Sequence, residues 1–365
     1  MPPCISPGVS VSSTVLKMSE SILILTTAHW EGDPRLNRHL AYLKNAGQDA
    51  SIIALMGDGG TGRIRNAISA FGLIWRRRAH AVLLPDPELF VVGSLIGRFR
   101  GVRTVIDVHE DYARAASGRD WIPTLLKPLV AAFAWLNDRV ARRVAHANLV
   151  AAPELAGRTS NVVLNIPDPS EFEQHPPALP AMVAYVGDVT IARGAVAMAE
   201  LAASMPDFRF LIVGRVDADV RSRMESIAPD NLELAGRRPH AEAWTMISGA
   251  LAGLSLLQPL PAYREAVATK LWEYCAAGIP PVGSDLPGQS RFLEKLSSDL
   301  IVRDMNEARS VLERLAGDRS WSEELRSRSR QLAEEEWERH RPDLAVQRVF
   351  APRPMTRRRG DSSPK

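Results

Sequence analysis

The feature that most constrains the fold of this 365-residue chain is a repeated alternation of short apolar runs with longer segments of helical period. The apolar runs have the length of buried strands, and the intervening segments have the spacing of amphipathic helices. Such alternation is typical of parallel β-α-β units, in which helices cover the faces of a sheet. Strands are predicted at residues 21–28, 49–55, 79–86, 102–109, 146–152 and 161–166, and again at 181–188, 207–214, 231–236, 251–257, 279–285 and 298–304.

A proline-rich stretch, residues 166–181, separates the two sets of strands. Dense proline opposes both helices and central strands, so this stretch is predicted to be a linker. We therefore expect one domain over residues 18–165 and a second over 182–335. Residues 1–17 are expected to be disordered or to precede the true start, and residues 351–365 to be a disordered tail. The predicted fold class is α/β, with two doubly wound parallel sheets that face a central cleft at the carboxyl ends of their strands.

The composition excludes several classes of protein. Hydrophobic residues make up 45% and charged residues 24% of the chain, as in soluble globular proteins. No apolar run reaches the length of about 18 residues that suggests a membrane span. The two cysteines, Cys4 and Cys275, offer neither a disulfide framework nor a metal-ligand spacing. This usage favours a reducing compartment, so we expect a cytoplasmic protein.

Arginine clusters dominate the charge distribution, although the net charge is only +3. They lie at residues 76–78, 142–143 and 357–359, and no aromatic interleaving or nucleic-acid motif accompanies them. We therefore predict solvated surface and no nucleic-acid partner. The apolar and basic segment 69–84 supports a weaker hypothesis, namely peripheral contact with an anionic membrane face.

One glycine-rich stretch has the spacing of a dinucleotide site but not its context. Gly57, Gly59 and Gly62 satisfy G-x-G-x-x-G, yet they follow the second predicted strand rather than the first. No acidic residue closes a further strand at the required distance. A mobile loop is therefore predicted here, and an NAD-dependent enzyme is kept only as a rival hypothesis.

Residues 265–285, EAVATKLWEYCAAGIPPVGSD, carry a stronger phosphate signal. Thr269 is predicted to cap a helix over residues 270–277 that stops at Gly278. The free N–H groups at the start of a helix suit a diphosphate, and Lys270 would add a full positive charge there. Glu273, one turn further, could accept hydrogen bonds from the vicinal hydroxyls of a ribose.

A plainer interpretation of the same stretch is also compatible with its spacing. Lys270 could pair with Glu273 or contact Tyr274 on the surface, and Glu265 could be solvated in the preceding loop. In the functional interpretation, Glu265 reaches hydroxyl groups of a sugar instead. Spacing alone leaves both interpretations open.

The stretch resembles the donor-binding segment of retaining glycosyltransferases of family 4, which have the two-domain GT-B fold. The matching positions are Glu265, Lys270, Leu271, Glu273, Tyr274, Ala276, Gly278, Pro280 and Val282, in the K-L-x-E-Y subtype. Residues 33–47, 107–112 and 185–196 resemble three further family segments, in the same order. The motif WERH resembles the closing tryptophan segment, which implies that a helix over residues 336–350 crosses back to the first domain.

The resemblance implies transfer of a sugar from a nucleotide-sugar donor to a hydroxyl acceptor, with retention of configuration and with no metal or other cofactor. We expect an acceptor from the envelope glycolipids, polysaccharides or secondary metabolites, and it could be lipid-linked. Retention itself is not derivable from the residues. In the family, the leaving phosphate is thought to help deprotonate the incoming hydroxyl.

Roles follow for individual residues. The candidate catalytic residues are His109, Glu265, Arg193 and Lys270; the candidate donor-binding residues are Gly32, Arg193, Lys270, Glu273, Gly214 and Gly236; and the candidate acceptor-side residues are Glu110 and Asp111. Arg193 and Lys270 form the expected cationic pair for the diphosphate, because arginine can hold phosphate oxygens with two parallel hydrogen bonds.

Three aspartates at other positions either have a different expected role or depart from the family pattern. Asp188 stands where many relatives have a phosphate-binding arginine. Asp107 is predicted to be structural, and Asp33 to cap the helix that Pro34 begins. The departure at Asp188 keeps two alternatives open, a non-catalytic nucleotide-sugar-binding protein and a nucleotide-sugar epimerase. A phosphorylase would need a cofactor lysine or a phosphate site, and the sequence shows neither. The H-E-D run at residues 109–111 is not predicted to bind a metal, because no second histidine lies at metal-ligand spacing from it.

Overall fold

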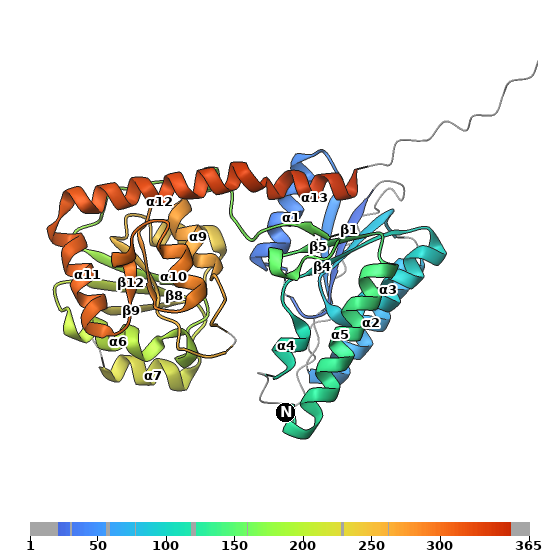
Figure 1. Cartoon of the computed structure of the whole chain (residues 1–365), viewed down its shortest axis with the longest axis horizontal. Helices are drawn as coiled ribbons and strands as arrows, with labels where there is room; N and C mark the ends of the chain where they lie inside the picture. Colours follow the sequence, from blue (N-terminus) through green and yellow to red (C-terminus); the bar gives the residue numbers. More distant parts are fainter. Residues whose placement is uncertain are drawn as a thin grey trace, which may run out of the picture.

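The computed structural model describes residues 21–29, 31–55, 59–76, 78–117, 122–158, 160–227, 230–261 and 263–351, with the side chains of 59–61, 116 and 117 left aside. The expectations for residues 1–17 and for the tail after residue 351 lie outside these ranges, as do Cys4, Gly57 and the 357–359 cluster. Two six-stranded parallel sheets form two domains that lie side by side (Figure 1). No helix in the described ranges is long and apolar enough to span a membrane.

The first sheet has the strand order β2-β1-β3-β4-β5-β6. Its strands are β1 (Ile22–Thr26), β2 (Ala50–Ala54), β3 (Ala81–Leu84), β4 (Arg103–Val108), β5 (Ala147–Val150) and β6 (Ser160–Val162). Its helices are α1 (Pro34–Asn45), α2 (Gly59–Trp75), α3 (Pro87–Arg100), α4 (Tyr112–Ser117) and α5 (Lys127–Val144), with short 3-10 turns at Thr124–Leu126 and Pro153–Leu155. The order reverses beside β1, where an open sheet leaves a crevice at the carboxyl ends of its strands.

The second sheet has the strand order β12-β11-β10-β7-β8-β9. Its strands are β7 (Met182–Val186), β8 (Arg209–Val213), β9 (Leu232–Gly236), β10 (Ala252–Ser255), β11 (Pro281–Ser284) and β12 (Ile301–Val302). Its helices are α6 (Ala195–Ser204), α7 (Ala218–Ile227), α8 (His240–Met246), α9 (Thr269–Ala276), α10 (Pro287–Leu293) and α11 (Met305–Gly317), with 3-10 turns at Ile191–Arg193 and Ser298–Leu300. Here the order reverses between β7 and β10, so the two sheets present their crevices to each other.

The ends of the elements follow their sequence signals in most places. Asp33 caps α1 by accepting the backbone N–H groups of Arg35 and Leu36, as predicted. Every predicted strand is present. The expected mobile loop at 57–62 is wrong in part, because α2 begins at Gly59.

The proline-rich stretch does more than connect the sheets. It contains a 3-10 turn, Pro169–Glu171, and its Phe172 is buried in the core of the second domain. The Phe172 ring packs edge-on against Trp244 with centroids 5.2 Å apart. The linker is therefore attached to the second domain by apolar contact.

Two consecutive helices tie the domains together. α12 (Arg319–His340) lies against α9 of the second domain, and α13 (Pro342–Phe350) lies against α1 of the first (Figure 1). At the junction Trp337 packs on Tyr42, with ring centroids 5.9 Å apart. The side chain of Arg103 donates to the carbonyl of Val349 at 2.9 Å, which fixes the end of α13 to β4.

Candidate functional site

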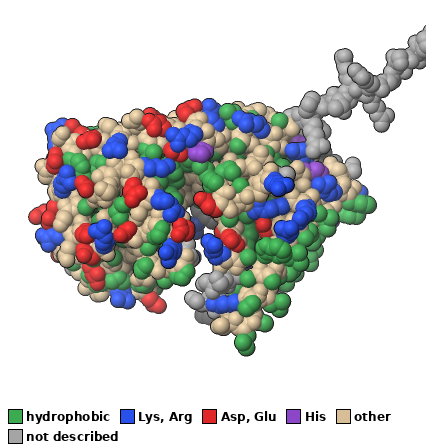
Figure 2. Space-filling model, in the orientation of Figure 1, with side chains coloured by type: hydrophobic (Ala, Val, Ile, Leu, Met, Phe, Trp, Pro, Cys, Tyr) green, Lys and Arg blue, Asp and Glu red, His purple; other side chains and the backbone are tan. Residues whose placement is uncertain are grey.

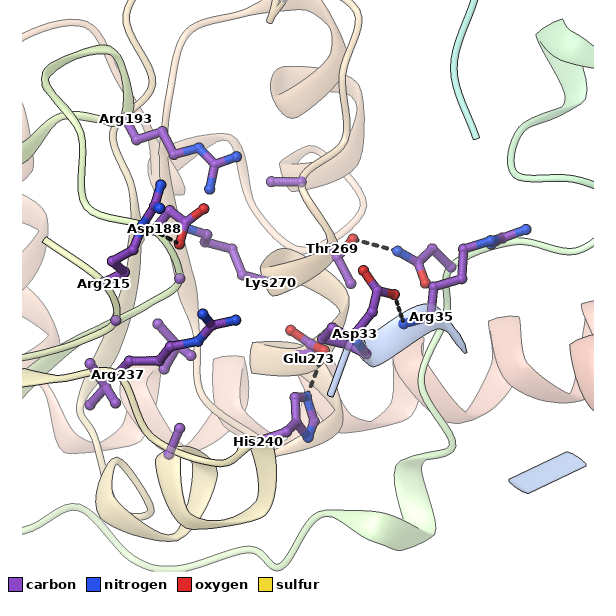
Figure 3. A pocket seen from close by; sticks show the side chains of 18 of the residues that line it. Asp33, Arg35, Asp188, Arg193, Arg215, Arg237, His240, Thr269, Lys270 and Glu273 are labelled. Atoms are coloured by element: carbon purple, nitrogen blue, oxygen red, sulfur yellow. Dashed lines mark hydrogen bonds and ion pairs between the residues drawn. The ribbon is translucent and has the colours of Figure 1, made fainter. Parts of the chain in front are cut away.

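A cavity of about 600 Å³ lies between the two domains at the carboxyl ends of the strands. The first domain contributes the start of α1, from Gly32 to Arg38, and the second contributes the loops after β7, β8 and β9 together with the start of α9 (Figure 3). Both sheets therefore direct their crevices at one space, as the doubly wound pattern predicts.

The start of α9 forms one wall of the cavity. Ala268, not Thr269, occupies the cap position, and no side chain caps the helix, so the predicted Thr269 cap is wrong. The hydroxyl of Thr269 instead accepts a hydrogen bond of 2.7 Å from the side-chain amide of Asn165. The free N–H groups of the first turn consequently keep no side-chain partner, and Gly278 ends the helix with a φ of 66° as expected.

Lys270 lies in the first turn of α9 and is only 9% exposed. Its ammonium nitrogen has no hydrogen-bond partner and lies 3.4 Å from the centroid of the Tyr185 ring. Burial holds the pKa of Lys270 well below its ordinary value, and Arg193 lowers it further. A buried amine of this kind gains most from an anion, because no carboxylate is bonded to it.

Glycines give the cavity its shape next to Lys270. A side chain at Gly187 would begin 3.3 Å from the Lys270 nitrogen, and a Cβ at Gly214 would lie only 1.8 Å from the Gly187 carbonyl oxygen. The ends of β7 and β8 therefore approach as closely as bare backbone permits. Gly236 ends β9 with a φ of 73° but does not line the cavity, unlike Gly32 and Gly214.

Positive side chains dominate the lining. Seven of the lining residues are Arg or Lys and three are Asp or Glu. Arg193 faces the space near Lys270, and Arg215 and Arg237 reach it from the ends of β8 and β9 (Figure 3). Asp188 follows β7, and Arg215, which follows the neighbouring strand β8, lies 4.0 Å from its carboxylate. An arginine is therefore present beside the position where many relatives have one. Such a lining suits a polyanion.

Glu273 faces the same cavity but is already engaged. Its Oε1 accepts a hydrogen bond from Arg38 of the first domain at 3.3 Å and lies 3.0 Å from Nε2 of His240. These two partners keep the pKa of Glu273 below its ordinary value despite burial, which would raise it. Arg38 also donates to the side-chain carbonyl of Asn165. No sequence pattern predicted this interdomain group, because its members are far apart in the chain.

Beneath the first-domain wall lies a buried ionic cluster. Arg35 holds Asp107 with two hydrogen bonds of 2.9 and 2.7 Å, and His39 lies 2.8 Å from the same carboxylate. Arg35 also donates to the carbonyl of Val163. Burial would raise the pKa of Asp107, but the Arg35 charge and the hydrogen bond with His39 keep it well below its ordinary value. Asp107 thus fixes the start of α1 against the sheet.

His109 follows β4 and does not line the cavity itself. Its ring packs edge-on against His29 at 5.4 Å, and His29 lies 3.1 Å from Asp33, which does line the cavity. Both ring nitrogens of His109 are buried without a hydrogen-bond partner, although Nδ1 lies 3.7 Å from the Asp107 carboxylate, and burial lowers the pKa of His109 to about 4. His109 is therefore neutral near pH 7, with two unused hydrogen-bonding groups behind the cavity wall.

The remaining candidates lie apart from the main cavity. Glu265 is exposed and accepts a hydrogen bond of 2.7 Å from Arg291, while the adjoining residues 266–270 line the cavity. Glu110 and Asp111 line a separate cavity of about 280 Å³ between α4 and α5. The structure thus brings together Gly32, Arg193, Gly214, Lys270 and Glu273, and it separates them from Glu265, Glu110 and Asp111.

Comparison with known proteins gives a family match for part of the chain. Residues 193–345 match a family model described as glycosyl transferase-like. This match begins at Arg193 and covers α9, α12 and the first residues of α13. No curated protein matches the sequence.

Solved structures match nearly the whole chain at low sequence identity. A sucrose-phosphate synthase from Thermosynechococcus elongatus has a TM-score of 0.67 at 15% identity over 91% of this chain and 98% of that one. The Anabaena protein HepE, in complex with UDP and glucose, has a TM-score of 0.63 at 13% identity, over 90% and 98%. A glycosyltransferase from Rickettsia africae has a TM-score of 0.65 at 12% identity, over 92% and 100%. The chain has the GT-B fold, as expected, and its second domain carries the glycosyl transferase-like sequence pattern.

Proposed function

We propose that this protein is a glycosyltransferase that transfers a sugar from a nucleotide-sugar donor to a hydroxyl acceptor. One observation carries the proposal: the buried ammonium group of Lys270 has no hydrogen-bond partner and lies at the start of α9, among the arginines of the cavity between the domains. That arrangement fits a diphosphate, which the free N–H groups of a helix start also bind. The family match and the UDP and glucose in the HepE structure support the same donor class.

The chemistry follows from where charge develops. As the bond from the sugar to the diphosphate breaks, negative charge accumulates on the leaving phosphate, and Lys270 and Arg193 would stabilise it. With those cations present, we propose transfer without a metal ion. We further propose retention of configuration, with a phosphate oxygen accepting the proton of the incoming hydroxyl. His109 and Glu265 would contact the sugar or the acceptor once the donor is bound.

A thermal-shift panel of nucleoside diphosphates and nucleotide sugars, with UDP and UDP-glucose first, tests the proposal. We expect one base to raise the melting temperature of the wild-type protein, and Lys270→Met to abolish this rise. Lys44→Met, an exposed lysine at the end of α1, is the matched control and should keep it. Stabilisation that survives Lys270→Met, or that is absent for every nucleotide, would contradict the proposed donor site. Product analysis with an alcohol acceptor then separates transfer from binding alone.

A further inference from the structure

The outer surface of three helices of the first domain is unusually apolar. α3 lies between α2 and α5 and contacts both, so the three helices form one layer on the sheet (Figure 1). Figure 2 shows hydrophobic side chains gathered along the edge of the molecule where these helices lie, with basic side chains next to them. We call this surface, the exposed side of α2, α3 and the Leu125–Val144 segment, the apolar face.

The spacing of the exposed residues shows that α3 is apolar on two sides. On α3, Val92, Leu95 and Phe99 recur at helical spacing on the exposed side, while Leu89 and Phe90 are buried on the other. A helix covers a sheet with one apolar side. The second, exposed apolar side of α3 therefore does not contribute to packing within the domain.

The neighbouring helices extend the same surface. On α2, Ile64, Ile68 and Trp75 are exposed, and the Trp75 ring stacks on Phe99 of α3 at 5.6 Å. On the other side of α3, Leu129 and Phe133 of α5 are each 69% exposed. Large apolar side chains that are this exposed and this close together mark an interaction site.

Charge identifies the partner of the apolar face. The three helices carry eight Arg or Lys side chains and two carboxylates, and Arg76 and Arg78 directly follow α2. Both carboxylates are neutralised, Glu88 by Arg63 at 2.6 Å and Asp138 by Arg142 at 2.7 Å. A second copy of this chain would bring like charges together, whereas anionic lipid headgroups complement them.

We propose that the apolar face docks on the surface of an anionic lipid bilayer, with Phe99, Leu129 and Phe133 entering the headgroup boundary and the surrounding arginines on lipid phosphates. Tryptophan and arginine near an apolar surface suit this boundary, since each has an apolar part and a polar group. The sequence hypothesis located such contact in segment 69–84. That location is wrong in part, because Ala81–Leu84 is the buried strand β3.

The apolar face adjoins the acceptor side of the protein. The cavity of about 280 Å³ that contains Glu110 and Asp111 is also lined by Trp135 of α5, which is exposed next to Arg139. Docking through α5 therefore places this cavity at the lipid surface. The inference deepens the proposed function by favouring an acceptor linked to a lipid, but the docking itself does not depend on transfer.

Co-sedimentation of the full chain with vesicles tests the docking. We expect binding to vesicles of phosphatidylcholine and phosphatidylglycerol in equal parts, at least about fivefold weaker binding to phosphatidylcholine alone, and weakening by added salt. Phe99→Ser combined with Phe133→Ser should reduce partition to the anionic vesicles by about tenfold or more. Leu179→Ser, which removes a 95% exposed leucine from the linker, should leave partition unchanged.

Two further measurements separate the outcomes. Melting temperature and any nucleotide-induced rise should be the same in the double variant and the wild type, so a folding defect or a failed donor site is recognised independently of lipid binding. Equal partition to both kinds of vesicle, no partition to either, or an unchanged double variant would overturn the proposal. So would a wild-type dimer in light scattering that the double variant converts to monomer, because the apolar face would then be an interface between copies.

Discussion

At the scale of single residues, the buried amine of Lys270 lies in an environment that does not favour its charged form unless an anion is bound. Its amine is buried over Tyr185 and has no hydrogen-bonded anion, so the charged form is disfavoured. We predict that Lys270→Met leaves the melting temperature of the ligand-free protein unchanged or raises it, because methionine fills the same space without a polar group. Calorimetry checks this prediction. A fall of several degrees would show that Lys270 supports the fold rather than a bound anion.

His109 gives a prediction for the dependence of stability on pH. Burial lowers its pKa in the folded protein to about 4, whereas the unfolded chain binds the proton near 6.5. Below pH 6.5 the unfolded state therefore binds more protons at this site, and stability falls until the folded histidine also titrates near 4. The loss at this site is at most about 3 kcal/mol. His109→Asn should reduce the loss in urea unfolding between pH 7 and 4.5.

The pH dependence of stability needs a control variant, because His29 contributes to it in the direction opposite to His109. Its pKa is raised, mainly by the hydrogen bond with Asp33, so the stability it adds is present below pH 6.5 and disappears as the pH rises. His175→Asn, on an exposed linker histidine, should leave the pH profile as in the wild type. If His109→Asn has the same profile as His175→Asn, the pKa of His109 is not the cause.

At the scale of elements, the strands were predictable because most of them are largely apolar runs bounded by turn residues. The start of α1 was predictable for a similar reason, since Asp33 and Pro34 act within one turn. The start of α9 was not predictable, because the hydroxyl of Thr269 bonds to Asn165, which lies far away in the chain, and does not cap the helix. Local signals predicted the elements and some of their ends, whereas contacts with distant polar groups decided the start of α9.

The site was predictable where its residues lie in a recognisable segment or at the end of a predicted strand, as Gly32, Arg193 and Gly214 also do. Lys270 and Glu273 were identified because helix spacing brings them to one cavity. The partners of Glu273, namely Arg38 and His240, were missed because no periodicity links them to α9. The contact of Arg215 with Asp188 was missed for a similar reason, since the two residues are far apart in the chain and meet because adjacent parallel strands end at one edge of the sheet.

The close approach of β7 and β8 yields a prediction at this scale. Gly214→Ala would place a methyl group 1.8 Å from the Gly187 carbonyl, so the two strand ends must move apart beside Lys270. We expect a loss of about 2 kcal/mol or more in the free energy of unfolding, together with loss of the nucleotide-induced thermal shift. Urea unfolding and the thermal-shift panel measure the two effects.

Gly72→Ala is the matched control for this substitution. Gly72 lies within α2, and a Cβ there would meet nothing within 4 Å. Alanine should therefore stabilise the helix by about 0.5–1 kcal/mol and leave the nucleotide shift intact. A nucleotide shift that Gly214→Ala also preserves would show that the donor site tolerates separation of β7 and β8.

At the scale of the whole molecule, two contacts set how the domains lie across the cavity. α12 and α13 form a continuous connection on one side, and the ion pair of Arg38 with Glu273 bridges the domains inside the cavity. Both side chains of that pair are about nine-tenths buried. The pair thus holds Glu273, the carboxylate expected to bind a ribose, against the first domain, so in the proposed function donor binding and domain arrangement would share one residue.

This sharing leads to a prediction for Arg38→Met. The substitution leaves Glu273 with His240 as a partner but without its interdomain one, and removing one member of a buried pair is costly. We expect a loss of about 2 kcal/mol or more in stability, a larger radius of gyration in small-angle scattering, and a fall in turnover that exceeds any fall in nucleotide affinity. Arg221→Met is the control, because Arg221 and Glu225 form an exposed pair within α7 worth at most about 0.5 kcal/mol. If the two variants have the same radius of gyration and the same free energy of unfolding, α12 and α13 alone fix the arrangement of the domains. Glu273 would then have no role in that arrangement.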